Sequence, residues 1–180
     1  LQQLDVWQHV QQDRTSAHTH MHVRANDSFG DIHFSCVEMG SDALGVIMEN
    51  QALVNGLAEA VSAQRNVQTV TAGIERVLTG PNQTMLMLDN NDALSCRLLV
   101  GADGGNSYIR KQAGFPITFK DYEHTAIVAN IRTAEPHNNV ARQAFTPTGP
   151  LALLPMADPH VCSIVWSQSP DAASALMSMD

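Results

Sequence analysis

Hydrophobic and polar residues change their spacing several times along the 180-residue chain, and each spacing predicts a different element. The first apolar residues recur every three positions, so the chain is expected to begin inside a helix. Residues 17–24 alternate in polarity and predict a strand. A turn at 26–30 would join it to a second strand at 31–38, which predicts a hairpin.

The middle and the end of the chain carry further periodic segments. Leu53, Leu57 and Val61 are spaced by four and predict an amphipathic helix over residues 47–64. Turn signals at 80–82 and 89–92 separate apolar runs. Further strands are predicted at 67–70, 74–79, 84–89, 94–100, 126–132, 142–146, 151–154 and 161–166, with helices beginning at Ser107 and Ala172.

This order of elements predicts an α/β (mixed α+β) fold with two interleaved domains. Residues 1–45 and 116–180 would form two parts of one β-sheet, and residues 46–115 would form part of an α/β domain. Hydrophobic residues make up 44% of the chain and charged residues 16%, a composition typical of a folded protein.

Charge and cysteine content exclude several classes of function. The formal charge of −8 is a poor match to nucleic acid, which selects a basic face, and it also disfavours anionic membrane surfaces. The three cysteines are widely spaced and form no CxxC pair, so we expect a reduced, cytoplasmic setting. No apolar run approaches the roughly 18–20 residues of a membrane span.

The segment 97–110 carries the most specific chemistry. An apolar run, 98–100, predicts a buried strand that ends in two small residues, Gly101 and Ala102. Small residues allow a ligand or another backbone to approach closely. Asp103 would then lie at the carboxyl end of the strand, where open α/β sheets bind their ligands.

A helix is expected to follow immediately. Gly104 and Gly105 permit a sharp turn, and Asn106 or Ser107 can cap the helix, whose N-terminus favours an anion. Arg110 would reach a phosphate or pair with Asp103. The same residues fit a capped strand–turn–helix without a ligand equally well, and they do not form a GxGxxG dinucleotide fingerprint.

The segment resembles the DG motif of flavoprotein aromatic hydroxylases. Arg97, the apolar run, the two small residues, Asp103-Gly104, Ser107 and Arg110 match this motif in order, and only Asn106 departs from it. The resemblance implies that Asp103 lies near the ribityl chain of FAD. It also implies that Gly104 and Arg110 belong to a motif that binds FAD and NAD(P)H.

A second set of segments is similar to the ubiquinone-biosynthesis hydroxylases, and its last run is closest to the VisC-type 2-polyprenylphenol 6-hydroxylases. These segments are 121–124, 127–132, 135–137, 140–143, 151–155 and 158–167. The likeness covers most of residues 47–170, whereas residues 1–45 fit only loosely. It implies a p-hydroxybenzoate-hydroxylase-like FAD-binding fold with an interleaved substrate sheet.

The resemblance also suggests further cofactor contacts. Asn50, and next Gln51, match a polar position that contacts the flavin in this family. A polar first turn of a helix explains these two residues equally well. Gly149–Pro155, with Trp166, is the candidate wall of the substrate site, although ordinary strand packing accounts for it too.

The implied activity is that of a monooxygenase that uses FAD, NAD(P)H and O₂ to hydroxylate the ring of a polyprenylphenol. No Ser–His–Asp triad or carboxylate pair is needed, because the cofactor supplies the chemistry, and the catalytic residues are unknown. Other ubiquinone-biosynthesis proteins are possible partners by this resemblance. The implied location is cytoplasmic, with peripheral contact to the inner membrane.

The chain is expected to be an internal fragment that is inactive alone. No GxGxxG precedes the matched segments and no Gly-Asp segment follows them, so these residues by themselves should bind FAD weakly or not at all. Two other functions stay open: a non-catalytic scaffold or quinone-lipid-binding domain with a hydroxylase-like fold, and a hydroxylase of a soluble aromatic compound.

A row of histidines is the remaining candidate for chemistry. His18, His20 and His22 would share one face of the predicted strand 17–24 and could offer ligands to zinc. No acidic or cysteine neighbour along the chain completes a metal motif. We therefore expect no metal site.

Overall fold

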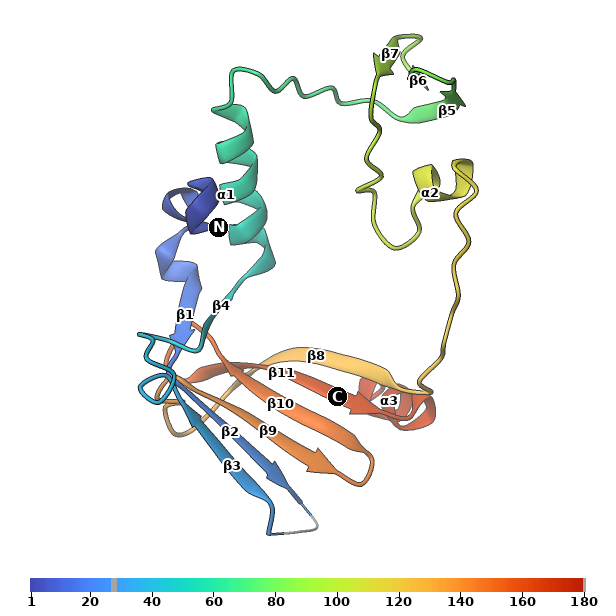
Figure 1. Ribbon diagram of the computed structural model, residues 1–180. Helices are drawn as coiled ribbons and strands as arrows, with labels where there is room; N and C mark the ends of the chain where they lie inside the picture. The colour runs from blue at the N-terminus through green and yellow to red at the C-terminus, as the bar shows by residue number, and fades with distance from the viewer. Residues whose placement is uncertain (27–28, 180) are drawn as a thin grey trace. The chain divides into compact units, whose positions relative to one another are not determined.

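A computed structural model describes residues 1–26 and 29–179 (Figure 1). The chain forms two compact units, one of residues 1–65 with 121–180 and the other of residues 66–120. The mixed α and β content expected from the sequence is confirmed. The units divide after residues 65 and 120, so the helix α1 (Asn50–Ser62) belongs to the first unit.

The larger unit is built on a six-stranded sheet with the order β3-β2-β9-β10-β11-β8. All neighbours are antiparallel except β2 and β9, which run parallel. Because β2 lies beside β9, segments on both sides of residues 66–120 share one sheet. The strands are β2 (His20–Ala25), β3 (Asp31–Ser35), β8 (Thr125–Arg132), β9 (Val140–Thr146), β10 (Gly149–Pro155) and β11 (Val161–Gln168).

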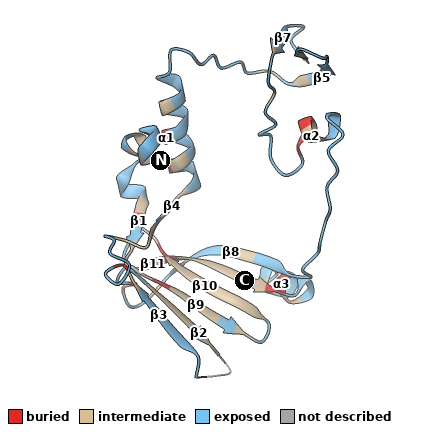
Figure 2. Cartoon of the chain, in the orientation of Figure 1, coloured by how far each residue is buried: buried red, intermediate tan, exposed pale blue. Residues whose placement is uncertain are grey.

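The buried part of this sheet lies around β9 and β11. Ala141 and Cys162 are buried, and Pro155, which pairs with Cys162 across β10 and β11, is fully buried. The helix α3 (Pro170–Met177) contacts β8 and β11 and buries Ala173. Figure 2 shows the central strands half-buried and the edge strand β3 exposed.

The N-terminal segment is not the helix predicted from its spacing. It forms three short 3-10 turns, η1 (Gln2–Leu4), η2 (Trp7–His9) and η3 (Gln12–Arg14). Asp5 has a φ of 53°, in the left-handed region, which ends the first turn before a longer helix can form.

Helix α1 packs against the second turn at a point of close approach. A Cβ on Gly56 would lie 2.9 Å from Val10 Cγ2 and 3.2 Å from the carbonyl oxygen of His9. Val10 and Ala52 are buried in this contact region of the unit. Glycine at position 56 therefore allows the helix and the turn to touch.

The strand predicted at 17–24 is two strands in different sheets. β1 (Thr15–His18) pairs with β4 (Gly45–Met48), whereas β2 joins the large sheet. The chain leaves one sheet for the other at Thr19, whose N–H donates to the Asn139 carbonyl. The expected single row of three histidines is therefore wrong, because His18 belongs to β1.

The hairpin predicted near the N-terminus is confirmed, since β2 and β3 are antiparallel neighbours. Residues 27 and 28 of its predicted turn lie outside the described residues. The predicted helix 47–64 begins only at Asn50, because residues 47 and 48 pair with β1 as part of β4.

The smaller unit contains a three-stranded antiparallel meander and one short helix, α2 (Tyr108–Gln112). Its strands are β5 (Ile74–Thr79), β6 (Thr84–Leu88) and β7 (Ala93–Cys96). Both predicted turns between these strands are confirmed. Asn91 adopts a φ of 67°, and the side-chain oxygen of Asn90 accepts a bond from the Asp92 N–H.

Two predicted strands of this unit are wrong. Residues 67–70 form no regular element, and the strand expected over 94–100 ends at Cys96. Leu98 and Val100 are 78% and 71% exposed, so their apolar run is not a buried strand here. An extended segment becomes a strand only beside a partner, and no described strand pairs with residues 97–100.

Candidate cofactor-binding site

Asp103 is the centre of a local hydrogen-bond cluster in the smaller unit. Its Oδ1 accepts from Ser107 Oγ at 2.5 Å, and its Oδ2 accepts from the N–H groups of Tyr108 and Ile109 at 2.7 and 3.1 Å. These bonds hold the turn 103–107 against the start of α2. The sequence Asp-Gly-Gly supplies the acceptor and the flexible residues, and Gly104 adopts a φ of 86°.

Ser107, not Asn106, is the N-cap of α2. Its buried hydroxyl donates to Asp103 and accepts from the Arg110 N–H at 2.9 Å. The first N–H groups of the helix are thus already bonded to side chains of the protein. These N–H groups are therefore not free, as the sequence interpretation assumed, and anion binding at this helix stays a prediction.

Arg110 lies beside the turn. One of its two predicted roles was to pair with Asp103, and the structure does not show this pair. Its guanidinium donates to the Gly105 carbonyl at 2.9 Å. The turn is therefore held from both sides, by the Asp103 carboxylate and by the Arg110 side chain. The other predicted role of Arg110, contact with a phosphate, stays a prediction.

These bonds keep the Asp103 carboxylate ionised. The hydrogen bond from Ser107 is the largest cause that lowers the pKa of Asp103, and the backbone bond from Ile109 adds to it. A carboxylate oxygen has two lone pairs, and Asp103 is exposed. The group can therefore accept a further bond from a ligand hydroxyl while it caps the helix.

A pocket of about 610 Å³ adjoins this turn within the smaller unit. Arg97, Gly101, Gly104, Ser107 and Arg110 are among the residues that line it. The pocket thus combines two cationic side chains with apolar walls from β5 and the 97–101 segment.

The glycines of the motif have different structural tasks. A Cβ on Gly101 would lie 3.0 Å from Ile109 Cβ and Cγ2, so this glycine lets the 97–101 segment approach α2. A Cβ on Gly104 or Gly105 would meet nothing within 4 Å. The surface at Gly104–Gly105 is therefore open to a ligand, whereas Gly101 serves internal packing.

Asn50 and Gln51, the other predicted cofactor residues, lie in the larger unit at the first turn of α1. Asn50 is exposed, and the Gln51 amide donates to Asn55 Oδ1 at 2.7 Å. Asp103, by contrast, belongs to the smaller unit. Their contact with a flavin stays a prediction.

The segment proposed as a substrate wall forms strand β10, and Trp166 lies on its neighbour β11. Leu151 is directly opposite Trp166 in the register of the two strands, so both point to one face of the sheet. The buried Trp166 Nε1 has no hydrogen-bond partner among the described residues. Leu151 and Trp166 therefore form part of one apolar face of the sheet.

Sequence reasoning missed one residue that positions the site. Tyr108 OH donates to the Glu75 carbonyl at 2.7 Å and ties α2 to the beginning of β5. The partner lies 33 positions away in the sequence, so no local pattern indicated the bond. The only signal in the sequence was the position of Tyr108 directly after the cap, where an aromatic side chain can anchor a helix.

Comparison with known proteins decides the family. Residues 1–175 match the family described as FAD binding domain. The chain belongs to the FAD binding domain family. The flavoprotein resemblance seen in the sequence is therefore confirmed, with Asp103 and its turn inside the matched region.

Curated relatives of this FAD binding domain are ubiquinone biosynthesis monooxygenases. The mitochondrial monooxygenase COQ6 of Danio rerio is 34% identical over 98% of this chain and 38% of its own length. The human protein of the same name is 33% identical over 100% of this chain and 40% of its own length. The chain thus spans about two-fifths of the length of these relatives.

Solved structures share the fold of this FAD binding domain at low sequence identity. PqsL of Pseudomonas aeruginosa, in complex with 2-aminobenzoylacetate, has a TM-score of 0.75 at 20% identity over 97% of this chain and 47% of its own. HpxO of Klebsiella pneumoniae, complexed with FAD and uric acid, has a TM-score of 0.63 at 15% identity over 92% and 43%. The expected p-hydroxybenzoate-hydroxylase-like fold is confirmed over the part that this chain covers.

Proposed function

We propose that the protein containing this chain is a flavin-dependent monooxygenase that hydroxylates the aromatic ring of a polyprenylphenol in ubiquinone biosynthesis. The observation that carries the proposal is the Asp103–Arg110 turn, with its open Gly104–Gly105 surface beside a pocket, in a chain of the FAD binding domain family. The identity of about one-third with ubiquinone biosynthesis monooxygenases supports the pathway.

The residues of the turn fit a flavin cofactor. Asp103 would accept a hydrogen bond from a hydroxyl of the ribityl chain, and the open backbone at Gly104 would allow the cofactor to approach closely. Arg110 and Arg97 line the pocket and would balance the negative charge of a phosphate. Asn50 and Gln51 are further candidate contacts. Bound FAD would supply the redox chemistry, with NAD(P)H as reductant and O₂ as co-substrate.

The apolar face around β10 and β11 would hold the phenol ring and exclude water. Leu151 and Trp166 contribute to this face. Water exclusion matters because reactive intermediates of such reactions decay in contact with it. No side chain needs to act as nucleophile or general base in this scheme.

Location and partners follow from the same proposal. Among the described residues no helix is long and apolar enough to cross a membrane. A cytoplasmic location with peripheral contact to the inner membrane is the prediction for this chain, whereas the curated relatives named above are mitochondrial proteins. Other ubiquinone-biosynthesis proteins would be its partners.

The first test measures flavin in the protein expressed from its complete reading frame. The purified protein should be yellow, and its visible absorbance should bleach when NAD(P)H is added without oxygen. A supplied polyprenylphenol should gain one oxygen atom, measured by mass spectrometry. A colourless, folded protein that FAD cannot reconstitute would contradict the proposal and favour a scaffold or quinone-lipid-binding function.

A matched pair of variants tests the assigned residues. Asp103→Asn should lower the retained flavin at least about tenfold, because the amide cannot replace the ionised acceptor. Asp92→Asn changes an exposed carboxylate in the β6–β7 turn of the same unit and should leave the flavin content unchanged. Equal flavin in both variants would remove Asp103 from the site. Oxidation of a soluble phenol in preference to the prenylated one would instead favour a soluble aromatic substrate.

A further inference from the structure

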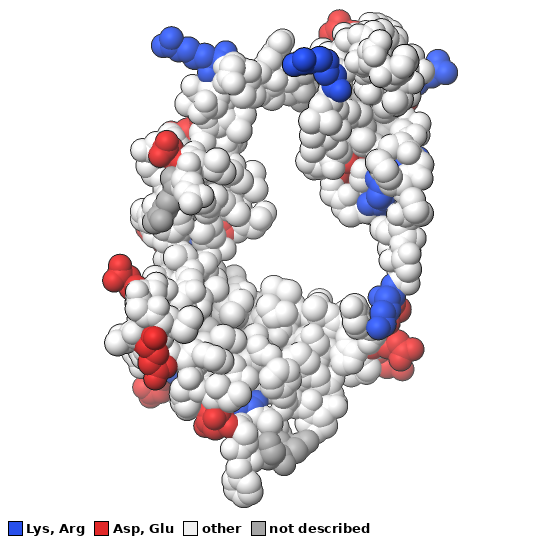
Figure 3. Space-filling view, viewed as in Figure 1, with Lys and Arg blue, Asp and Glu red and all other residues white. Residues whose placement is uncertain are grey.

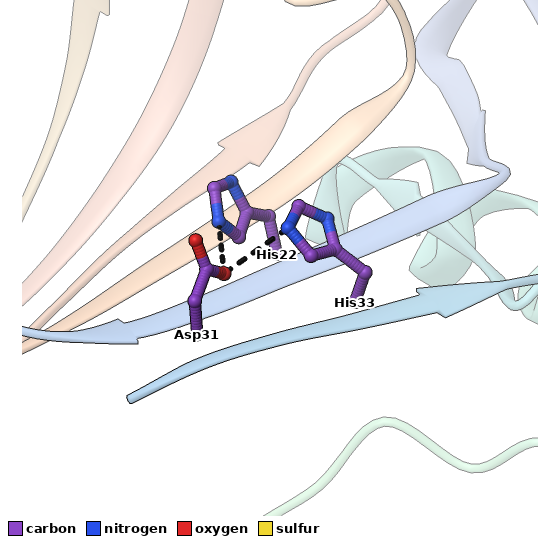
Figure 4. Close-up of side chains that lie close together, drawn as sticks. All are labelled: His22, Asp31 and His33. Carbon is purple, nitrogen blue, oxygen red and sulfur yellow. Dashed lines mark hydrogen bonds and ion pairs between the residues drawn. The ribbon is translucent and has the colours of Figure 1, made fainter. Parts of the chain in front are cut away.

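The hairpin β2–β3 brings two histidines and an aspartate together at its surface (Figure 4). His22 on β2 lies directly opposite His33 on β3 in the register of the two strands. Asp31 precedes His33 by two positions and therefore shares its face of the sheet. The three side chains converge although Asp31 and His33 lie nine and eleven positions after His22 in the sequence.

The geometry of the cluster is that of a convergent ligand set. His22 Nε2 lies 2.5 Å and His33 Nε2 lies 3.1 Å from the same oxygen, Asp31 Oδ1. The two imidazole rings are stacked, with centroids 4.0 Å apart and an interplanar angle of 21°. One ligand atom from each residue falls within 4.8 Å of the others.

We propose that His22, Asp31 and His33 form a binding site for a divalent transition metal ion of the Zn²⁺ class, with solvent completing the coordination. Imidazole nitrogen and carboxylate oxygen are ligands of Zn²⁺ at about 2.0–2.2 Å, which places tetrahedral ligand atoms about 3.4 Å apart. The His33–Asp31 separation is close to this spacing. The shorter His22–Asp31 separation must open by about 1 Å.

The side chains have the freedom that this adjustment requires. The His33 side chain is 68% exposed and the Asp31 side chain 51%, so rotation of either meets little resistance. His22, at 28% exposure, is the more fixed member and would set the position of the ion. With two nitrogen ligands and one carboxylate, the set suits Zn²⁺ better than Ca²⁺ or Mg²⁺, which select oxygen.

One neighbouring charge opposes the ion. Arg24 lies opposite Asp31 in the strand register and on the same face. Its guanidinium is exposed, so solvent screens its effect on the site. Arg24→Gln should therefore tighten metal binding modestly, by about threefold.

The site would join the edge strand β3 to its neighbour β2. β3 is exposed along most of its length and pairs with a strand on one side only. A metal ion held by ligands from both strands would fix their register. The ion would thus have a structural role, separate from the turn around Asp103.

Zinc titration of the purified protein, freed of any histidine tag, tests the proposal. Calorimetry should find one Zn²⁺ per chain with a dissociation constant of about 10 µM or tighter. His33→Ala, Asp31→Asn and His22→Ala should each weaken binding at least about tenfold. His33 is the decisive position, because its side chain is exposed and the alanine variant removes a ligand without removing core packing.

His20→Ala is the matched control. His20 lies on the same strand and face as His22 and is exposed, but its ring bonds Thr19 and lies outside the cluster. This variant should bind Zn²⁺ as the unchanged protein does, and Zn²⁺ should raise its melting temperature but not that of His33→Ala. The proposal would be overturned if His33→Ala still bound zinc, or if His20→Ala lost zinc binding equally. It would also be overturned if the unchanged protein bound no zinc at 100 µM Zn²⁺ (roughly ten times the expected constant).

Discussion

The two compact units of this chain are stabilised in different ways. The larger unit buries apolar residues from distant segments, including Val6, Val10, Ala141 and Cys162. In the smaller unit the buried apolar residues are Leu86, Leu88 and Ile109, and the turn 103–110 is held mainly by hydrogen bonds. Its exposed large apolar residues are Val67, Val70, Leu78, Leu94, Leu98, Val100, Phe115, Ile117 and Phe119.

The units also differ in charge. Residues 66–120 contain five Lys and Arg against four Asp and Glu, a net charge of +1, whereas the remaining residues contain five against fourteen, a net charge of −9. Figure 3 shows several of these acidic groups on the visible surface of the larger unit. The overall charge of −8 therefore says little about the candidate cofactor site, because the unit that contains it has a net charge of +1 and does not repel an anionic ligand.

The largest stability effect is expected in the sheet of the larger unit. Gly149 has a φ of 139°, and a Cβ there would lie 2.2 Å from the Ser167 carbonyl oxygen. Gly149→Ala should lower the free energy of unfolding by about 3 kcal/mol, measured by urea denaturation with tryptophan fluorescence. Gly40→Ala, at a φ of 62° in open space, should cost only about 1 kcal/mol. Equal losses would mean that the backbone contact is not limiting.

A smaller effect is expected at the packing contact of the smaller unit. The side chain of Gly101→Val would clash with Ile109. The variant should destabilise residues 66–120 by about 2 kcal/mol, measured by amide hydrogen exchange of that unit. Gly105→Ala is the control, because an added Cβ there meets nothing within 4 Å. Faster exchange in the control than in Gly101→Val would contradict the assigned roles of the two glycines.

The N-cap of α2 should contribute less to stability than the Gly101 contact does. Ser107→Ala removes both the bond to Asp103 and the bond from the Arg110 N–H, with an expected cost of about 1 kcal/mol. Amide exchange at residues 108–112 measures it. Ser95→Ala, which removes one exposed side-chain bond to Gln83, should leave exchange at these residues as it is in the unchanged protein.

Acid should weaken both units slightly. The bond from Ser107 lowers the pKa of Asp103, and the backbone bond from His160, with help from Arg132, lowers the pKa of Asp158. A lowered carboxyl pKa stabilises the fold above the ordinary range near pH 4, and the contribution is lost as pH falls through the lowered value. Amide hydrogen exchange of residues 66–120 at neutral pH and at about pH 3 should show a smaller acid-induced loss of stability in Asp103→Asn than in the unchanged protein, because the variant has no carboxyl group at this position to protonate.

Local pattern determined most strands and turns of this chain. The strands between 125 and 168 and the turns at 80–82 and 89–92 follow from alternation and turn residues, and the sequence narrowed the cap of α2 to Asn106 or Ser107. The family resemblance at 97–110 was also readable, because the motif is contiguous. These features depend on neighbours along the chain, which the sequence displays directly.

Only the tertiary structure decided which segments meet. It divided residues 15–25 between two sheets, left residues 97–100 without a strand partner, and bonded the first helical N–H groups to Asp103. It also replaced the expected histidine row by a cluster of His22 with Asp31 and His33. Such contacts depend on strand register and on partners distant in sequence, so no periodicity within one segment could have specified them.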